Sequence, residues 1–471
     1  MAAPMCILFQ SIKKPSWQIL KKKVNHLTVR YYSASGSNIL SLEGRGLYHD
    51  MVPANSAFAL SKQLNSSPQC IYCGFDPTAD SLHVGNLLTL ISLIHCQRAG
   101  HQIIALIGGA TAMIGDPSGK SSERPVLNIE EVESNVKRLE VSLHRIFTNH
   151  ERYFWRKQKK LLPYKILNNS DWYNDINLVK FLSTAGRHFR MHKLLSRDSV
   201  RSRLSSPDGM SFQEFSYQIF QAYDFLHLHQ NHKCILQVGG SDQLGNLSSG
   251  HDFVKRVTGK DVYGITIPLL TTSQGAKLGK TAGNAVWIND DRTSTFDLYQ
   301  SFVRLQDADV EKYLKAFTFL SLAEIESVLK THKANPKIRS AQKLLAEQVL
   351  LLVHGETGLD QALRLTDALY NSSPSTLEVL SPSELSDLFK GALTHKVILE
   401  AGTTVLELAE RIQCAPRGVT AEKLIREGGL YINQERESNP EAVLRRGEHI
   451  LENGLTLVRV GKKNYFIITW I

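Results

Sequence analysis

Blocks of apolar and polar residues alternate along the first half of this chain and predict strands and helices in turn. Short apolar runs predict buried strands, and they occupy residues 70–75, 101–107, 163–167 and 234–238. Longer stretches with apolar residues three and four positions apart predict helices, and they occupy residues 82–96, 129–147 and 211–226. Strands that alternate with helices are typical of an α/β fold with a doubly wound, Rossmann-like parallel sheet.

The second half of the chain predicts two units of a different kind. From residue 294 to about 389 the apolar spacing is helical throughout, which predicts a small all-α domain. Beyond residue 402 two short helices, at 405–412 and 421–427, precede a turn into a strand and a hairpin. We therefore expect an α/β part over residues 33–290, a helical part over 291–395 and a small α+β part over 400–471.

Composition narrows the class of protein. The chain has 471 residues, of which 42% are hydrophobic and 21% are charged, values that are ordinary for a globular protein. No apolar run approaches the ~20 residues that a membrane-spanning helix needs. Of the six cysteines only Cys70 and Cys73 are closely spaced, and no second pair complements them. We therefore expect reduced thiols and no zinc site.

The net charge of +10 is concentrated at the N-terminus. Residues 1–42 contain six Lys and Arg residues but no Asp or Glu, and apolar residues are interleaved with the charges. This pattern predicts a mitochondrial transit peptide over residues 1–32, with cleavage near Tyr32. A basic tail that contacts RNA is the alternative.

The candidate chemistry lies where the predicted strands end. After the strand at 70–75, a polar turn leads to His83 and Gly85 at the start of a helix. A helix N-terminus offers free backbone N–H groups and partial positive charge, so it suits a polyphosphate. Two further polar motifs, at 108–120 and 239–243, also follow strands, and ligands of parallel sheets bind at that edge. Far downstream, residues 277–281 read Lys-Leu-Gly-Lys-Thr and supply two cations.

These motifs and the segment 217–224, in this order, resemble the tyrosyl-tRNA synthetases of the bacterial and mitochondrial branch, which are class I aminoacyl-tRNA synthetases. The resemblance covers roughly residues 40–471. It implies a ligase that activates L-tyrosine with ATP and Mg²⁺ and transfers it to the 3′ end of tRNA(Tyr). It also implies a homodimer in the mitochondrial matrix, without a protein-bound metal or a membrane partner.

The resemblance assigns the phosphate and adenosine contacts to the loops. The residues that would act on the phosphates and the reacting carboxylate are Thr78, His83, Lys120, Arg124, Gln243, Lys277, Lys280 and Thr281. Those that would hold ATP are Cys73, Gly85, Asn86, Thr89, Gly240 and Asp242, together with Lys277 and Lys280. Activation needs no protein nucleophile, because positioning and charge stabilisation suffice. This agrees with a site that is rich in cations.

The resemblance also implies a tyrosine pocket. Its residues would be Tyr72, Asp76, Asp116, Tyr217, Gln221, Asp224 and Gln243. Tyr72 and Asp224 would hold the phenol hydroxyl, whereas Asp116, Tyr217 and Gln221 would surround the α-amino group. Tyr217, Gln221 and Asp224 stand at i, i+4 and i+7, so one helix face carries all three. An ordinary amphipathic helix is the alternative.

Two positions depart from the family pattern. Asn86 replaces the His that usually ends the first signature, so it can bind ribose but adds no charge. Leu244 stands where the family often has Trp, and we assign it no role.

RNA-facing parts are implied as well. The insertion at about 130–232 would lie at the dimer interface and meet the acceptor stem through the basic segment 186–203, although a solvated helix face is the alternative. The domain at 291–395 would lie on the anticodon side. The domain at 400–471 resembles an RNA-binding module of a small-subunit ribosomal protein, or else only caps the fold. Its candidate phosphate contacts are Lys423, Arg426, Lys462 and Lys463.

Two other functions compete with this one. A tryptophanyl enzyme shares the fold, but indole offers one donor and no hydroxyl to Tyr72 and Asp224. A non-catalytic RNA-binding protein, such as an intron-splicing factor, is the second alternative. The intact Lys277, Lys280 and His83 favour catalysis.

Overall fold

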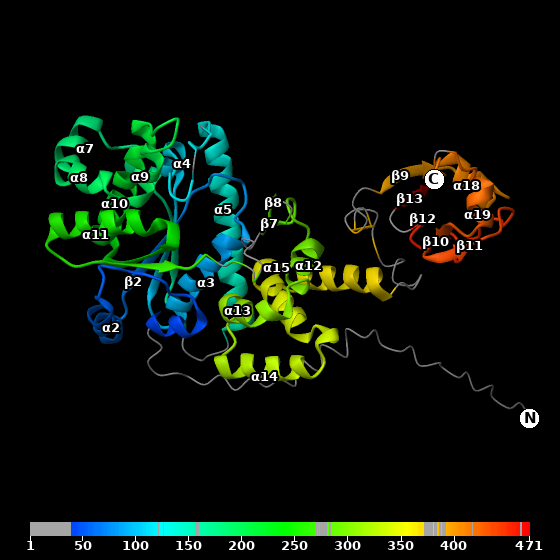
Figure 1. The fold of residues 1–471 in the computed structure, drawn as a ribbon, viewed down its shortest axis with the longest axis horizontal. Helices are drawn as coiled ribbons and strands as arrows, with labels where there is room; N and C mark the ends of the chain where they lie inside the picture. Colours follow the sequence, from blue (N-terminus) through cyan, green and yellow to red (C-terminus); the bar gives the residue numbers. More distant parts are fainter. Residues whose placement is uncertain are drawn as a thin grey trace, which may run out of the picture.

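The computed structural model describes residues 39–471 apart from 121, 126, 156–159, 270, 272, 274–279, 282–283, 372–379, 381–383, 386–387, 389–391, 417 and 462–463 (Figure 1). The transit peptide expected over residues 1–32 lies outside this range. Within it, no helix is both long and apolar enough to cross a membrane.

A six-stranded sheet forms the centre of the first part of the chain. Its order is β1-β6-β5-β2-β3-β4, and all neighbours are parallel except β1 and β6. The strands are β1 Met51–Val52, β2 Cys70–Phe75, β3 Gln102–Ile107, β4 Tyr164–Asn168, β5 Cys234–Gly240 and β6 Tyr263–Ile267. The predicted parallel sheet is therefore confirmed. Because the chain winds from β2 to β3 on one side and returns to β5 on the other, a crevice is expected at the carboxyl ends of β2 and β5.

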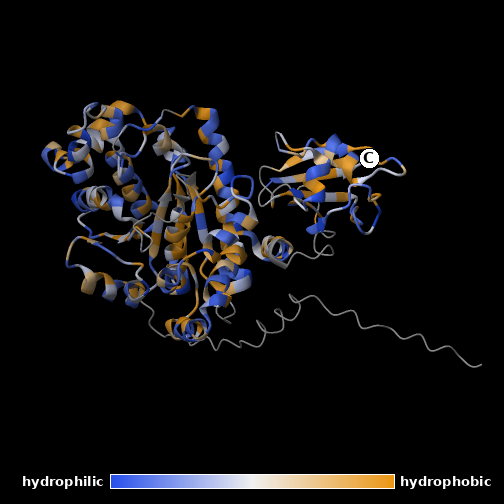
Figure 2. Ribbon diagram, turned by 45° about the vertical axis from the view of Figure 1, so that its right-hand side comes forward, coloured by the Kyte–Doolittle hydropathy of each residue, from blue (hydrophilic) through white to orange (hydrophobic). Residues whose placement is uncertain are grey.

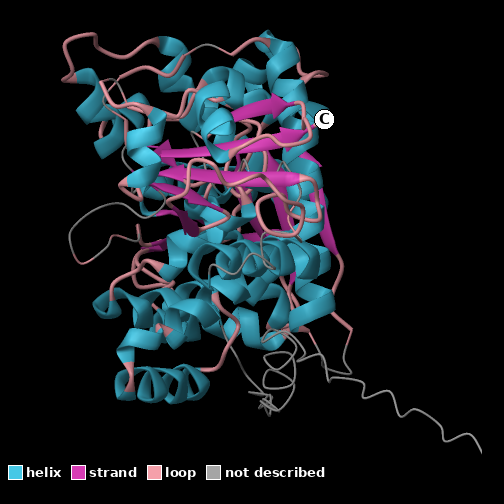
Figure 3. Cartoon of the chain, turned by 90° about the vertical axis from the view of Figure 1, so that its right-hand side faces the viewer, coloured by secondary structure: helices cyan, strands magenta, loops and turns pink. Residues whose placement is uncertain are grey.

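Helices cover both faces of this sheet (Figures 1 and 3). They are α2 Ala57–Ser66, α3 Val84–Arg98, α4 Gly109–Ile114, α5 Ile129–Asn149, α6 Ser170–Tyr173, α7 Leu178–Thr184, α8 Met191–Leu195, α9 Asp198–Leu204, α10 Phe212–His232 and α11 Leu244–Thr258. Helix α10 follows a Ser211 cap and ends at His232, before the C-cap residue Lys233, which has a positive φ of 56°. It is six residues longer at its C-terminus than the sequence pattern predicted.

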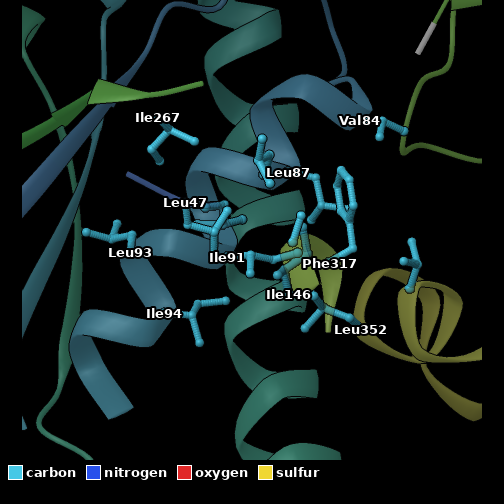
Figure 4. Close-up of a cluster of buried hydrophobic side chains, with 14 of the residues drawn as sticks. Leu47, Val84, Leu87, Ile91, Leu93, Ile94, Ile146, Ile267, Phe317 and Leu352 are labelled. Carbon is cyan, nitrogen blue, oxygen red and sulfur yellow. The ribbon is translucent and has the colours of Figure 1, made fainter. Parts of the chain in front are cut away.

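The next segment consists of helices over residues 295–371. They are α12 Thr295–Val303, α13 Asp307–Phe317, α14 Leu322–Ala334 and α15 Ser340–Asn371, which is kinked at Gly355. These helices share one continuous hydrophobic core with α3 and α5. Figure 4 shows Phe317 and Leu352 beside Ile91 and Ile146. The shared core fixes these helices on the flank of the sheet.

The chain ends in a separate five-stranded sheet with two helices. The strands are β9 Leu393–Val397, β10 Leu430–Ile432, β11 Glu435–Glu437, β12 Leu455–Val460 and β13 Asn464–Trp470, in the order β11-β10-β12-β13-β9. The helices are α18 Val405–Arg411 and α19 Ala421–Arg426. This unit has a hydrophobic core of its own (Figure 2). The predicted β12–β13 hairpin is confirmed, while β9, which pairs in parallel with β13, was not predicted.

Candidate active site

One cavity of about 470 Å³ opens at the carboxyl ends of β2, β3 and β5. All predicted site residues whose side chains the structure describes line this cavity: Tyr72, Cys73, Asp76, Thr78, His83, Gly85, Asn86, Thr89, Asp116, Lys120, Arg124, Tyr217, Gln221, Asp224, Gly240, Asp242 and Gln243. Lys277 lies outside the described residues, and for Lys280 and Thr281 only the backbone, strand β7 (Lys280–Thr281), is described. The sequence motifs thus converge on one place.

Asp224 is a buried carboxylate with a fixed orientation. Its two oxygens accept hydrogen bonds from Asn169 Nδ2 and from Trp172 Nε1, each at 3.0 Å. Burial raises the pKa of Asp224 to about 7, although these two donors pull it down. Asp224 is therefore an acceptor that ionises near neutral pH.

Tyr72 is also buried, on β2, with its ring edge-on to Phe225 at 5.2 Å. Its hydroxyl has no hydrogen-bond partner among the described residues. Burial and the nearby charge of Asp224 raise the pKa of Tyr72 well above its usual value. An unpaired buried hydroxyl is costly, and here it lines the cavity, where a ligand could pair with it.

Asp76 joins the same network from the end of β2. It accepts hydrogen bonds from Thr111 Oγ1 at 2.8 Å and from the Tyr217 hydroxyl at 2.7 Å. Burial raises its pKa to about 6. Asn169 also donates to Thr111 Oγ1, at 3.0 Å, so hydrogen bonds run without a break from Tyr217 to Asp224. Glycine is required at Gly108, because a Cβ there would lie 1.9 Å from an Asp76 oxygen.

Asp116 forms a second polar centre with Gln243. Gln243 Nε2 donates to Asp116 Oδ2 at 2.7 Å, and the Ser118 N–H donates to Asp116 Oδ1 at 2.9 Å. The buried Asn246 donates to Gln243 Oε1 at 3.0 Å. Gln221 lines the cavity between Tyr217 and Asp224 on α10. The predicted face of this helix therefore does point into the cavity.

His83 and Asn86 cap helix α3. His83 Nδ1 accepts from the Asn86 N–H, and Asn86 Oδ1 accepts from the His83 N–H, both at 3.1 Å. This reciprocal capping box explains why Asn is suitable at position 86. It also occupies one of the two lone pairs of the Asn86 oxygen, while the amide nitrogen of Asn86 remains a donor for the predicted ribose contact. A Cβ at Gly85 would lie 2.9 Å from the His83 ring.

The segment after the Lys-Leu-Gly-Lys-Thr motif lies directly beside this cap. The Val84 N–H donates to Val286 O at 3.0 Å, and the Ile288 N–H donates to Leu82 O at 2.9 Å. The short strands β7 and β8 (Asn284–Ala285) immediately precede this contact. The segment that follows the second motif, about 200 residues later in the sequence, is therefore held beside the first motif.

Four residues of the network were given no role on the basis of sequence: Thr111, Asn169, Trp172 and Asn246. Asn169 directly follows β4, and Trp172 lies in the short helix α6 just after it. That position was the available signal, since ligands gather at the carboxyl ends of parallel strands.

The basic segment 186–203 requires a correction. Arg203 is 1% exposed and forms a bidentate ion pair with Glu214, at 2.7 and 2.8 Å. Such a buried pair cannot contact RNA. Lys193 and Arg197 lie 3.7 and 3.3 Å from Asp252. Arg187, Arg190 and Arg201 are exposed.

Comparison with known proteins agrees with this geometry. The family model of class I tRNA synthetases (W and Y) matches residues 64–371. The mitochondrial tyrosine–tRNA ligase of Drosophila melanogaster is 49% identical over 99% of this chain and 100% of its own. That of Homo sapiens is 50% identical over 93% of each chain.

Two solved structures are similar in fold and sequence. The C-terminally truncated mitochondrial tyrosyl-tRNA synthetase of Coccidioides posadasii has a TM-score of 0.63 at 35% identity, over 74% of this chain and 94% of its own. That of Aspergillus nidulans has a TM-score of 0.65 at 33% identity, over 75% and 98%. The present chain therefore belongs to the class I tRNA synthetase family (W and Y), and within it to the tyrosine–tRNA ligases.

Proposed function

We propose that this enzyme activates L-tyrosine with ATP and transfers the tyrosyl group to the 3′ end of tRNA(Tyr) in mitochondria. The unpaired Tyr72 hydroxyl beside the carboxylate of Asp224 carries the choice of amino acid. The phenol of a bound tyrosine would donate to Asp224 and accept from Tyr72. Indole has one donor and no acceptor, so tryptophan would leave Tyr72 unsatisfied at a cost of about 1–3 kcal/mol.

In the first step an oxygen of the tyrosine carboxylate attacks the α-phosphorus of ATP. A carboxyl–phosphate bond forms, the bond to the β-phosphate oxygen breaks, and pyrophosphate leaves. We assign His83, Lys120 and Arg124 to the charge on the leaving phosphates, with Thr78 beside them and Lys277, Lys280 and Thr281 added from the sequence motif. Asp76, Asp116, Tyr217 and Gln221 would hold the tyrosine ammonium, and Gln243 the reacting carboxylate. Cys73, Gly85, Asn86, Thr89, Gly240 and Asp242 would hold adenosine.

Mg²⁺ would enter with the nucleotide. No group of three or more His, Cys, Asp or Glu side chains in the described part of the chain could hold a metal ion. Phosphate oxygens are ligands that Mg²⁺ readily retains, so the ion would be bound through ATP, whose phosphate charge it would partly neutralise.

In the second step a hydroxyl of the terminal ribose of tRNA attacks the tyrosyl carbonyl, and AMP leaves. The exposed Arg187, Arg190 and Arg201 are suitable contacts for the acceptor stem. The helices at 291–371 would face the anticodon side. We assign RNA binding to the C-terminal sheet and its two helices, where Lys423 and Arg426 form exposed ion pairs with Glu427 and Glu422 that phosphates could replace.

A truncation tests this RNA assignment. It should remove the whole C-terminal unit from residue 372, because a cut at residue 400 would leave β9 without its partner β13. We expect pyrophosphate exchange to survive, while tRNA charging falls and tRNA binding becomes less dependent on salt. Normal charging at physiological salt would reduce this unit to a structural cap.

We further propose that two copies of the chain associate through exposed apolar side chains of α7 and of the start of α10. Leu178, Val179 and Leu182 of α7 are 69%, 73% and 51% exposed, and Phe212 at the start of α10 is 78% exposed. Sedimentation of Phe212→Asp tests this proposal, and we expect monomers. Phe58→Asp is the matched control, since Phe58 is 83% exposed on α2, far from α7 (Figure 1). A dimeric Phe212→Asp protein would contradict the assignment.

Charging of tRNA(Tyr) and tRNA(Trp) with each amino acid tests the function directly. We expect tyrosine to be attached to tRNA(Tyr), and loss of this activity in Lys277→Ala. RNA binding without charging would favour a splicing factor, which the names of the relatives do not favour.

A reporter fused to residues 1–32 should enter the mitochondrial matrix, and a cytosolic reporter would contradict the predicted destination.

A further inference from the structure

The first turn of helix α10 contacts three separate parts of the molecule through neighbouring residues. Ser211, Gln213 and Glu214 each bind a different segment, and the same helix carries Tyr217, Gln221 and Asp224 further along. Figure 1 shows α4, α9 and α10 in the same part of the molecule. This turn therefore connects the tyrosine-binding helix to its surroundings.

Ser211 links this turn to the loop that carries Lys120 and Arg124. Its hydroxyl accepts the Glu214 N–H at 3.2 Å, as a helix cap, and donates to Glu123 Oε1 at 2.5 Å. A hydrogen bond to a carboxylate is stronger than one between neutral groups. The loop is thus attached to α10 at Glu123, the residue next to Arg124.

Gln213 holds the other end of the same loop. Its Nε2 donates to Met113 O at 2.8 Å and to Ile114 O at 3.3 Å, which are carbonyls in the last turn of α4. Two residues of one helical turn therefore hold the segment 113–124 at its beginning and near its end.

The turn itself is firmly anchored. Glu214 forms the buried bidentate ion pair with Arg203 of α9, and Glu214, then Glu123, raises the pKa of Arg203. Removing one partner of a buried pair is costly, so this contact fixes the start of α10. Ser211 and Gln213 are thus rigid attachment points for the loop.

Arg124, the residue after Glu123, has contacts of its own at the cavity. Its Nε donates to Asp116 O at 2.8 Å, and its side chain packs over Gly115, where a Cβ would lie 3.5 Å from Arg124 Cβ. Its charge reaches Asp76 and Asp242, whose raised pKa values it partly lowers. Arg124 therefore points toward the site while its neighbour Glu123 is held by α10.

We propose that Glu123 is a positioning residue: its hydrogen bond to the Ser211 cap holds the 113–124 loop so that Arg124 meets the phosphates of ATP. The proposal rests on the function assigned above. Glu123 is exposed and is adjacent to the cavity without lining it, so it would act only through its neighbour.

The residues assigned to tyrosine should not respond to the loss of the hydrogen bond between Glu123 and Ser211. Asp116 belongs to the same loop, but its carboxylate accepts hydrogen bonds from Gln243 and from the buried Asn246, which both lie outside the loop. Asp224 and Asp76 belong to the network of Asn169 and Thr111, which does not include Glu123. Loosening the loop at Glu123 should therefore affect the ATP step and spare the binding of tyrosine.

Tyrosine-dependent pyrophosphate exchange in Glu123→Ala tests the proposal, with Glu133→Ala, an exposed glutamate of α5, as the matched control. We expect kcat to fall about tenfold in Glu123→Ala, while the KM for tyrosine changes less than about twofold. Glu123→Gln keeps an acceptor for Ser211 and should recover most of the rate. Ser211→Ala combined with Glu123→Ala should be no slower than the slower single variant.

Three results would overturn the proposal: a Glu123→Ala rate equal to that of Glu133→Ala, a parallel rise in the KM for tyrosine, or additive losses in the double variant. Thermal unfolding of each variant shows whether the fold is intact. If the unmodified enzyme itself shows no exchange with tyrosine, the assigned function fails, and this inference fails with it.

Discussion

The two ends of the cavity are built in different ways. At the tyrosine end most side chains are buried and bind one another, as Asp224 does with Asn169 and Trp172. At the phosphate end Lys120 is exposed on a loop, and Arg124 is held mainly through backbone and neighbouring contacts. One end is rigid before any ligand arrives, and the other presents cations on connecting segments.

The difference corresponds to two tasks. Discrimination between amino acids requires polar groups that cannot relax when the wrong ligand binds, and buried networks provide this. Acceleration requires charge that interacts most strongly as pyrophosphate departs, and loop cations can provide it. Substitutions at the two ends should therefore alter different kinetic constants.

The largest effect should come from the phosphate end. Arg124→Ala should lower kcat for adenylate formation by about 100-fold, because one charged donor to the developing negative charge is lost. The KM for tyrosine should stay nearly constant. Pyrophosphate exchange over a range of tyrosine concentrations measures both values, and a matching rise in the KM for tyrosine would show that the two ends are not separate.

Asp224→Ala should change the choice of amino acid rather than the rate of adenylate formation. Removing the acceptor of the phenol hydroxyl should reduce the preference for tyrosine over phenylalanine by about 10- to 100-fold, since a hydrogen bond to a charged group is lost. The ratio of kcat/KM values for the two amino acids measures this preference. Undiminished preference in the variant would remove Asp224 from the pocket.

The pH dependence should separate the two amino acids. The pKa of Asp224 is raised to about 7, so its carboxylate loses its charge as the pH falls through 7. Between pH 8 and pH 6, kcat/KM for tyrosine should fall by up to about tenfold relative to that for phenylalanine, which does not use this acceptor. Because Asp224 holds its proton more tightly in the folded than in the unfolded chain, it also stabilises the fold below pH 4. This contribution to stability is lost as the pH rises through about 7. A ratio of kcat/KM for tyrosine to that for phenylalanine that stays constant between pH 8 and pH 6 would contradict the assignment of Asp224.

The smallest effect should come from Thr111→Val. This change keeps the side-chain volume but removes the hydroxyl that donates to Asp76 and accepts from Asn169. We expect the affinity for tyrosine to fall about fivefold, the value of one hydrogen bond of ~1 kcal/mol. Equilibrium binding of tyrosine measures it. No change would mean that Asp76 and Asn169 are held without Thr111.

The sequence alone predicted much of the fold, because the strands and helices with strong periodicity formed as expected. Strands β2 to β5 and the helical segment at 295–371 are examples. Strand β6 was missed because Gly264 interrupts its apolar run, and a Cβ at that position would lie 2.7 Å from Leu247. Helix packing against the sheet requires that glycine, and periodicity does not record such a requirement.

Those parts of the site were predicted in which a single helix or strand carries several of the site residues. The face with Tyr217, Gln221 and Asp224 follows from helix geometry. The roles of Asn169 and Trp172 arise only when the end of β4 is folded against α10. Similarly, Arg203 looks like a surface cation in the sequence, but its pairing with Glu214 becomes apparent only in the packed structure. Contacts between distant segments are therefore what the sequence left undetermined.

The central claim is that the buried pair of Tyr72 and Asp224 selects tyrosine for activation by ATP. Pyrophosphate exchange by residues 33–471 with tyrosine, phenylalanine and tryptophan, each titrated separately, tests it most directly. We predict exchange with tyrosine at concentrations at least about 100-fold lower than with either other amino acid. Equal exchange with tryptophan, or no exchange with tyrosine, would contradict the account.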